Sequence, residues 1–487
     1  MHPLARLDHQ HVWHPFTQMR EWLRRAPILI ESGKGAILRD IDGREYLDAN
    51  SSIWTNLHGH QHPMLNRAVR RQLDRIAHSS ALGLASGPAA RLAARLVSAA
   101  RPPALPRRLP TRPERELSRV FFSDDGSTAI EVALKLAYEF VRRTRGIRLP
   151  KFLSMGGAYH GDTVGAVSVG HIDLFHRAYR GLLFKSDQLM APYCYRCPFN
   201  RAAPDRQDAR GYRRCGWECV QQTEKLFERR KRAEPYAALV VEPSIQGAAG
   251  MIPQPDGWLK RIADLARHHG TLLIADEVMT AFGRVTAGKI SATGRRLRSA
   301  APPPLFACQS EGVTPDFLCV AKGLTGGYLP MAATLTNDDV FGAFLGEYEE
   351  FKTFFHGHSY TGNPLGASCA LASLDVLESN SSLRARQMLH QAMQDDLQSL
   401  WNLPQVGDIR QVGLVAGIEL VRNWRTRAPF AMHERVGHRV CEAMARRGVL
   451  TRPVGNVIVV MPTYATTRAQ MRRIVEVLGE AIDSTLS

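Results

Sequence analysis

The chain has 487 residues, a formal net charge of +17 and 44% hydrophobic residues. This composition is typical of a globular protein of more than one domain, and it excludes a chain that is disordered throughout. No run approaches the about 18 apolar residues of a membrane span, and the N-terminus lacks the residue order of a signal peptide. We therefore expect a cytoplasmic protein without a membrane partner.

Much of the excess basic charge lies in two proline-rich stretches, residues 101–113 and 294–304. Proline at this density favours loops over a recognition helix. No zinc-finger, RNP or basic-zipper pattern accompanies the charge, so we expect no nucleic-acid partner. Both stretches are long for loops, and we expect them, together with the whole segment from Val285 to Pro304, to be disordered or to form a surface flap.

The N-terminal region begins the chain's pattern of strands and turns. Residues 35–48 alternate between apolar and polar, which predicts a β-hairpin with Asp42 and Gly43 at its turn. Three histidines lie between residues 58 and 62, but no fourth ligand follows at a suitable spacing. We interpret them as part of a loop and helix cap, followed by a helix over residues 64–76.

Residues 120–137 have the pattern of a strand, a polar turn and a helix. Gly126, Ser127 and Thr128 are thus expected at the helix N-terminus, where free N–H groups and the helix dipole attract phosphate. The alternative is an ordinary cap, since hydroxyl residues cap many helices. Another short strand, residues 151–155, precedes a glycine-flanked turn with Tyr159 and His160. This turn is either a stacking face for a flat cofactor or the site of a packed tyrosine.

Four of the eight cysteines are close in sequence, with Cys-x2-Cys and Cys-x3-Cys spacing: Cys194, Cys197, Cys215 and Cys219. The spacing loosely matches a structural zinc site. We favour a surface excursion with incidental, reduced thiols, because the second pair is not the usual Cys-x2-Cys. We therefore expect no bound metal.

Three short apolar runs end at Glu242, Asp276 and just before Lys322. Such runs are typical of strands buried on both faces of a parallel sheet, and ligands bind at the carboxyl ends of these strands. A lysine and a carboxylate at this edge suit pyridoxal phosphate (PLP) chemistry, in which the lysine bonds the aldehyde and the carboxylate pairs with the pyridine nitrogen. The alternative is a plain parallel sheet with solvated charges at its strand ends.

Seven stretches, in order along nearly the whole chain, resemble the motifs of class III PLP-dependent aminotransferases. They are WHPFTQM (13–19), DDGSTAIEVALK (124–135), YHGDTVGAVS (159–168), EPSIQG (242–247), IADEVMTAFGR (274–284), AKGLTGG (321–327) and HGHSYTGNP (356–364). Within the class, the chain is most similar to the 7,8-diaminopelargonate (8-amino-7-oxononanoate) aminotransferases of biotin synthesis.

The resemblance implies an α/β protein of PLP fold type I. A large domain would have a mostly parallel central sheet flanked by helices, and a small α/β domain would combine both chain ends. We expect residues 1–66 and 357–487 to form the two parts of the small domain, and residues 67–356 to form the large PLP-binding domain. The resemblance also implies a homodimer with its active site at the interface.

The resemblance assigns roles toward PLP to matching positions. Lys322 would bond the cofactor and shuttle protons, Asp276 would pair with the pyridine nitrogen, and Tyr159 would complete the catalytic set. The residues implied to bind the cofactor are Gly126, Ser127, Tyr159, His160, Glu242, Asp276, Lys322 and, through the neighbouring subunit, Ser359.

For small-molecule substrates, the resemblance implies contacts from Phe16, Ile53, Trp54, Tyr159, Gly357 and Arg452. Arg452 would bind the distal carboxylate of the oxononanoate, since a guanidinium fork suits a carboxylate. The alternative interpretation of Arg452 is an ordinary surface arginine that precedes a strand.

The implied reaction converts 8-amino-7-oxononanoate to 7,8-diaminononanoate by a ping-pong mechanism, with S-adenosylmethionine or L-lysine as amino donor. Many members that use S-adenosylmethionine carry tyrosine and tryptophan where this chain has Phe16 and Ile53, and we favour the lysine branch on that basis. Three alternatives are an ω-amino acid, diamine or ornithine-type transaminase, a PLP racemase or aminomutase, and a basic binding protein that keeps the scaffold.

Overall fold

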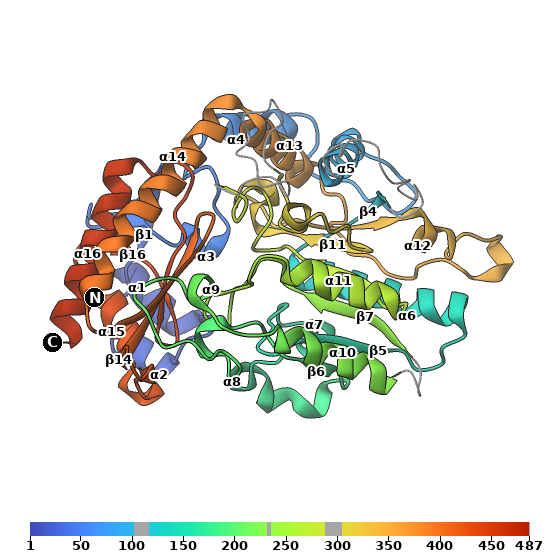
Figure 1. Cartoon of the computed structure of the whole chain (residues 1–487). Helices are drawn as coiled ribbons and strands as arrows, with labels where there is room; N and C mark the ends of the chain where they lie inside the picture. The colour runs from blue at the N-terminus through green and yellow to red at the C-terminus, as the bar shows by residue number, and fades with distance from the viewer. Residues whose placement is uncertain (102–115, 231–234, 288–303, 487) are drawn as a thin grey trace.

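The computed structural model describes residues 1–101, 116–230, 235–287 and 304–486. Figure 1 shows a central sheet with helices packed over it, and a second group of sheets and helices that contains both chain termini. We expected a disordered loop or a surface flap over residues 101–113 and 285–304, and of these residues 102–113 and 288–303 lie outside the described ranges. For residues 285–287 the expectation is wrong: they are buried, and Val285 packs in a core with Val412 and Val415.

In the described chain, the central sheet has seven strands in the order β4-β12-β11-β10-β7-β5-β6. Strand β12 pairs antiparallel with both β11 and β4, while the pairs among β11, β10, β7, β5 and β6 are parallel. The predicted mostly parallel sheet is therefore confirmed. The strands are Leu117–Ser123 (β4), Lys151–Met155 (β5), Asp187–Leu189 (β6), Tyr236–Val241 (β7), Leu272–Asp276 (β10), Phe317–Val320 (β11) and Ala332–Asn337 (β12).

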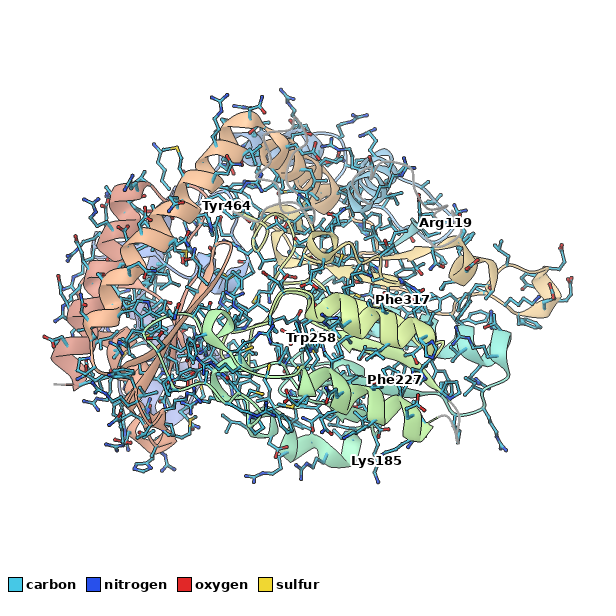
Figure 2. The ribbon with its side chains drawn as sticks, viewed as in Figure 1. Arg119, Lys185, Phe227, Trp258, Phe317 and Tyr464 are labelled. Atoms are coloured by element: carbon cyan, nitrogen blue, oxygen red, sulfur yellow. The ribbon has the colours of Figure 1, made fainter. Side chains whose placement is uncertain are left out.

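The central strands β7, β10 and β11 are apolar along nearly their whole length, up to Asp276 at the end of β10, because both faces of the sheet are covered. Along β7, Leu239 and Val241 belong to one core with helix α11, and Ala238 and Val240 to another core with helix α6. Successive side chains of a strand point to opposite faces, so a strand covered on both sides needs an unbroken apolar run. Figure 2 labels one fully buried member of each core, Trp258 of α11 and Phe317 of β11.

Helix α6 begins and ends at the residues that its sequence signals indicate. The Asp125 side chain accepts a hydrogen bond from the Thr128 N–H (2.9 Å), and Gly146 ends the helix in the left-handed conformation (φ +66°). This confirms the predicted strand, turn and helix. The helices in this middle part of the described chain are α4 (Pro63–Leu73), α5 (Gly87–Ala100), α6 (Gly126–Arg145), α7 (Val164–Ser168), α8 (Asp173–His176), α9 (Ala209–Tyr212), α10 (Glu218–Arg230), α11 (Trp258–His268), α12 (Asp338–Gly342) and α13 (Pro364–Glu378).

The two chain ends combine in one sheet, as predicted for the small α/β unit. Strand β16, from the C-terminal region, pairs in parallel with β3 of the N-terminal hairpin. The hairpin itself is β2 and β3, with Gly43 in the turn at φ +82°. The strands outside the central sheet are β1 (Ile30–Lys34), β2 (Ile37–Asp40), β3 (Glu45–Asp48), β8 (Ile245–Gln246), β9 (Ile252–Pro253), β13 (Val406–Val412), β14 (Val415–Asn423), β15 (Ala428–Pro429), β16 (Val449–Leu450), β17 (Pro453–Val454) and β18 (Val457–Val460).

The helices of the chain ends are α1 (Pro3–His11), α2 (Met19–Trp22), α3 (Ser51–Trp54), α14 (Asn380–Leu397), α15 (Val436–Arg446) and α16 (Arg468–Leu486). Helices α14 and α15 both contact α16. The predicted boundary at residue 66 falls inside α4, and α13, which follows the boundary at residue 357, packs against α4 and α5. The three predicted domain ranges remain a proposal. No helix in the described ranges is long and apolar enough to cross a membrane.

Candidate active site

Glu242, Asp276 and Lys322 meet at one edge of the central sheet, as predicted. Asp276 is the last residue of β10, Glu242 directly follows β7, and Lys322 lies two residues after the end of β11. Since these are three neighbouring strands with parallel pairing, their carboxyl ends open onto the same side. All three residues line one cavity of about 1810 Å³.

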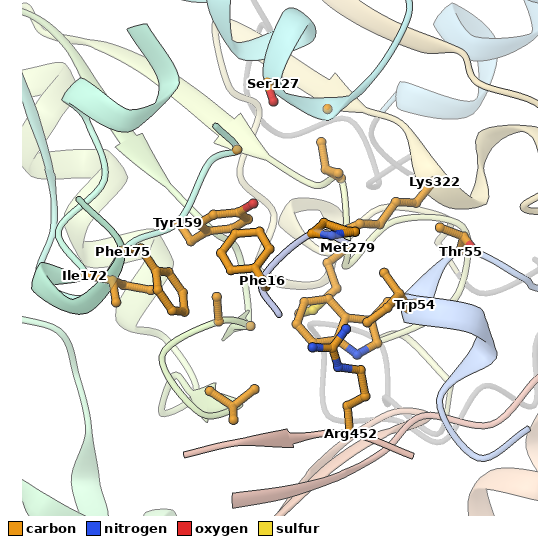
Figure 3. Close-up of a pocket in the computed structure, with 18 of the residues that line it drawn as sticks. Phe16, Trp54, Thr55, Ser127, Tyr159, Ile172, Phe175, Met279, Lys322 and Arg452 are labelled. Carbon is orange, nitrogen blue, oxygen red and sulfur yellow. The ribbon is translucent and has the colours of Figure 1, made fainter. Parts of the chain in front are cut away.

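Eleven of the thirteen residues predicted for the site line this cavity. They are Phe16, Ile53, Trp54, Gly126, Ser127, Tyr159, His160, Glu242, Asp276, Lys322 and Arg452. Figure 3 shows Ser127 near one end of the pocket and Arg452 at the other, with the Lys322, Trp54, Tyr159 and Phe16 side chains between them. The cavity therefore extends from the N-terminus of α6 to the loop between β16 and β17.

Asp276 is buried and hydrogen-bonded to an imidazole. Its Oδ2 accepts a hydrogen bond from Nδ1 of His160 (2.7 Å), and Oδ1 accepts one from the N–H of Val278 (3.0 Å). Burial alone would lower the pKa of His160, but the hydrogen bond and the charge of Asp276 outweigh it and raise this pKa. A carboxylate oxygen accepts more than one hydrogen bond, so Asp276 can still serve a cationic N–H in the cavity.

Lys322 places its amine in the cavity from a strained backbone position. It begins the 3₁₀ turn Lys322–Thr325 with φ +42°, in the left-handed region that non-glycine residues rarely adopt. Its Nζ lies 5.0 Å from the centre of the Trp54 ring. Burial lowers the pKa of Lys322, while the charges of Asp276 and Glu242 partly oppose this shift. A lowered pKa increases the fraction of neutral amine, which is the nucleophilic form.

Glu242 ties two loops of the site together. Its Oε1 accepts a hydrogen bond from the Tyr159 N–H (3.3 Å), and its Oε2 accepts one from the Gly247 N–H (2.9 Å). Burial, reinforced by the charge of Asp276, raises the pKa of Glu242 to about 7. Near neutral pH this carboxyl group therefore changes its charge inside the cavity.

The N-terminus of α6 forms the end of the cavity where Ser127 lies. Gly161 approaches it so closely, at φ +111°, that a Cβ there would lie 2.1 Å from Oγ of Ser127. The Asp162 N–H also donates to that Oγ (3.3 Å). The first N–H groups of a helix have no partner within the helix, so this end of the cavity favours an anionic group.

The segment that carries Ile53 and Trp54 is held in an unusual backbone conformation. Four successive residues, 51–54, have φ values of +47°, +47°, +68° and +67°. Ile53 is β-branched, for which this region is a genuine outlier. Side-chain contacts hold the turn: Asn50 accepts a hydrogen bond from Nε1 of Trp54 (2.8 Å), and Ser51 Oγ donates to the carbonyl of Met461 (2.6 Å). Strain of this kind concentrates at functional sites.

Arg452 supplies a positive charge at the far end of the cavity. It lies between β16 and β17 and is exposed. Within the described residues no carboxylate pairs with Arg452, whereas Arg435, which lines the same cavity, pairs with Glu21 at 2.6 Å. Arg452 is thus available for an anionic ligand.

Gly357 and Ser359 do not line the cavity of their own chain. Both are exposed, and the carbonyl of Ser359 accepts a hydrogen bond from Nε2 of His78 (2.9 Å). Ser359 was predicted to reach the cofactor of a neighbouring subunit, and the structure contains a single chain. The roles assigned to Gly357 and Ser359 therefore stay predictions.

The sequence analysis missed part of the apolar wall, namely Ile172, Phe175 and Met279. The Phe175 ring lies 5.2 Å from that of Phe16 and 6.2 Å from that of Tyr159. No motif marks Ile172 or Phe175, which lie in and beside a short helix. Met279 is within one of the recognised stretches, three residues after Asp276, and that proximity was an available signal.

Comparison with known proteins places the chain in a family. The family model for class-III aminotransferases matches residues 19–482. A protein of Geobacter sulfurreducens named adenosylmethionine-8-amino-7-oxononanoate aminotransferase is 46% identical over 98% of this chain and 96% of its own length. The chain belongs to the class-III aminotransferases, a family of PLP enzymes, as the sequence motifs indicated.

Two solved structures extend the comparison. The crystal structure of the adenosylmethionine-8-amino-7-oxononanoate aminotransferase of Methanocaldococcus jannaschii matches with a TM-score of 0.85 and 37% identity, over 99% of each chain. An amine transaminase of an uncultivated Pseudomonas species, solved with PLP bound, matches with a TM-score of 0.84 and 31% identity, over 97% of this chain and 98% of its own. Since both match closely, the fold alone does not separate their substrates.

The raised pKa of Glu242 predicts a pH dependence of stability. In the unfolded chain its pKa returns to the ordinary value of 4.5, so between pH 4.5 and about 7 the folded state binds more protons than the unfolded state. The free energy of unfolding should therefore fall as pH rises through this range, by up to roughly 3 kcal/mol from this group. The test measures the free energy of unfolding in urea, without added cofactor, at about pH 5 and about pH 8. Between these two pH values it should fall less for Glu242→Gln than for the unaltered protein. Glu224→Gln, at an exposed position of α10, is the control; equal losses in all three proteins would contradict the assignment.

Proposed function

We propose that the chain is an 8-amino-7-oxononanoate aminotransferase of biotin synthesis that uses PLP and forms 7,8-diaminononanoate. The observation that carries this proposal is Arg452, a guanidinium without a carboxylate partner among the described residues, at the opposite end of the cavity from Ser127. Aromatic and apolar side chains separate the two ends. Such a cavity suits a substrate with an apolar chain, a terminal carboxylate and a reacting group near its other end.

The residues at the sheet edge fit PLP. The N-terminus of α6, with Gly126 and Ser127, suits its phosphate, and the buried Asp276, held in place by a hydrogen bond from His160, suits a protonated ring nitrogen. Lys322 has the amine that would bond its aldehyde. When bound, PLP would supply an electron sink that allows a C–H bond beside the amine to break.

The chain's own residues would perform the remaining tasks. Asp276 would hold the proton at the ring nitrogen, and Nζ of Lys322 would carry a proton between the donor carbon and the cofactor carbon. Tyr159, whose hydroxyl donates a hydrogen bond to Asp162 (2.7 Å), would form the wall of the site beside the PLP ring. Phe16 and Trp54 would exclude water from the apolar part of the substrate, and Arg452 would fix its carboxylate.

The protein is proposed to act as a homodimer. Leu82, Leu84, Phe355 and Tyr360 are large apolar residues that are 92%, 63%, 76% and 59% exposed. Their two loops lie together, since the Tyr360 ring packs on that of His78 (4.8 Å). Exposed apolar groups that cluster in this way are typical of a protein interface. A second copy covering these loops would bring its Gly357 and Ser359 toward the cavity.

The proposed amino donor is S-adenosylmethionine, because the named relatives carry that substrate in their names. Phe16 and Ile53 led us to favour lysine, and both residues line the cavity as predicted. If Phe16 and Ile53 determine which amino donor binds, the donor is lysine; if they do not, it is S-adenosylmethionine.

Separate half-reactions test the proposed function. The purified enzyme is mixed with S-adenosylmethionine or with L-lysine, and the visible absorbance of bound PLP is followed. Loss of the absorbance with S-adenosylmethionine, and its return on adding 8-amino-7-oxononanoate, is the expected result. Loss with lysine alone would confirm the lysine preference instead. No response to either donor, together with turnover of a simple amine and a keto acid, would establish the ω-transaminase alternative.

The role of Arg452 predicts a selective effect on one substrate. Arg452→Ala should raise KM for 8-amino-7-oxononanoate by roughly 10- to 100-fold, because a charge-assisted hydrogen bond contributes about 1.5–3 kcal/mol. KM for the amino donor should change far less. Arg473→Ala on α16, which removes an exposed arginine paired with Glu480, is the control. Equal increases of KM for both substrates would refute the assignment.

A further inference from the structure

The four clustered cysteines surround a second, much smaller cavity, separate from the candidate active site. Cys194 lies in the 3₁₀ turn Cys194–Arg196 and Cys219 in the first turn of α10, while Cys197 and Cys215 flank these elements. All four line a single cavity of about 10 Å³. This is about the volume that one water-sized atom occupies. The fold therefore brings together, around a space for one atom, two pairs of thiols from separate segments of the chain.

These four thiols differ from the other cysteines of the chain. Cys319 and Cys369 are buried singly and donate hydrogen bonds to the carbonyls of Ala129 and Thr325. In the cluster, Cys194 and Cys219 are buried and Cys197 and Cys215 are half-buried, and all are free thiols. Four thiols around one small cavity have the number and type of ligands that structural zinc takes.

The surroundings of the cavity suit a negatively charged centre. Nη1 of Arg213 lies 3.1 Å from Sγ of Cys215. The Trp217 ring holds this arginine, whose guanidinium carbon lies 4.3 Å from the ring centre, with Arg261 also over the ring at 4.6 Å. No carboxylate among the described residues lines the cavity.

We propose that Cys194, Cys197, Cys215 and Cys219 bind one Zn²⁺ as a structural tetrathiolate site. Four sulfur ligands in Cys-x2-Cys and Cys-x3-Cys pairs match the tetrahedral coordination of structural zinc. Each thiol releases its proton to solvent as its sulfur bonds the metal, and Arg213 offsets part of the remaining negative charge. As the thiols stand, no three His, Cys, Asp or Glu side chains in the described ranges are arranged to hold a metal. Binding therefore requires the sulfurs to turn toward the cavity by rotation about χ1.

The site would connect the two parts of the molecule. The turn that carries Cys194 also carries Arg196, whose Nε donates to Glu419 of β14 (2.6 Å), and Tyr193, whose hydroxyl also donates to Glu419. Glu419 in turn pairs with the buried Arg410 (2.6 Å). Zinc would fasten this turn to the start of α10, and so fix the contact between the large unit and the C-terminal sheet.

The test measures metal content of the full chain, prepared without a polyhistidine tag and passed through a chelating buffer. We expect about one zinc per chain, and a lower Tm once zinc is removed. A Cys194→Ser, Cys219→Ser double variant should lose the metal, while Cys441→Ser, at a buried cysteine of α15, should keep it. Less than about a tenth of a zinc in the unaltered chain, or zinc retained by the double variant, would overturn the proposal.

A second measurement needs no variant and remains decisive if the double variant does not fold. A thiol-specific mercurial added to the unaltered protein should release zinc in proportion to the thiols it modifies, as read by a chromophoric chelator. Co²⁺ added alone to the zinc-depleted chain should give the visible bands of tetrahedral cobalt thiolate. Absence of both signals, or an intact mass that shows these cysteines joined as disulfides, would contradict a zinc site.

Discussion

The structure depends on the placement of a lysine and two carboxylates at the carboxyl edge of three adjacent parallel strands. Glu242, Asp276 and Lys322 would each be costly to bury alone. Together with His160 they compensate one another, and the compensation is incomplete: Glu242 titrates near neutrality and the amine of Lys322 loses protons more readily than in water. The fold thus brings a reactive amine and two buried, hydrogen-bonded carboxyl groups together at one site.

Both ends of the chain complete this site. The sheet edge and the N-terminus of α6 come from the central region, while Phe16, Trp54 and Arg452 come from the N- and C-terminal regions. The pairing of β3 with β16 holds these distant segments together. The strained turn of residues 51–54 then directs Trp54 between Lys322 and Arg452. The chemistry and the recognition of the substrate are therefore built by different parts of the chain, and each can change without the other.

The sequence predicted the sheet edge well because buried parallel strands leave an unbroken apolar run with a polar residue at its end. It predicted Arg452 only through resemblance, since one arginine before a short strand has no local signal. Ile172 and Phe175 were missed because their place in the wall depends on how a loop packs. The clustering of four cysteines depends on the approach of two segments about twenty residues apart, which spacing alone did not establish.

The most direct measurement locates the covalent attachment of the cofactor. Borohydride makes the carbon–nitrogen bond between an enzyme lysine and PLP permanent, and peptide mass spectrometry then identifies the modified residue. The account predicts that the cofactor mass lies on the peptide with Lys322, and that Lys322→Ala binds PLP without this attachment. Attachment at another lysine, or an unaltered visible absorbance in Lys322→Ala, would contradict the central assignment.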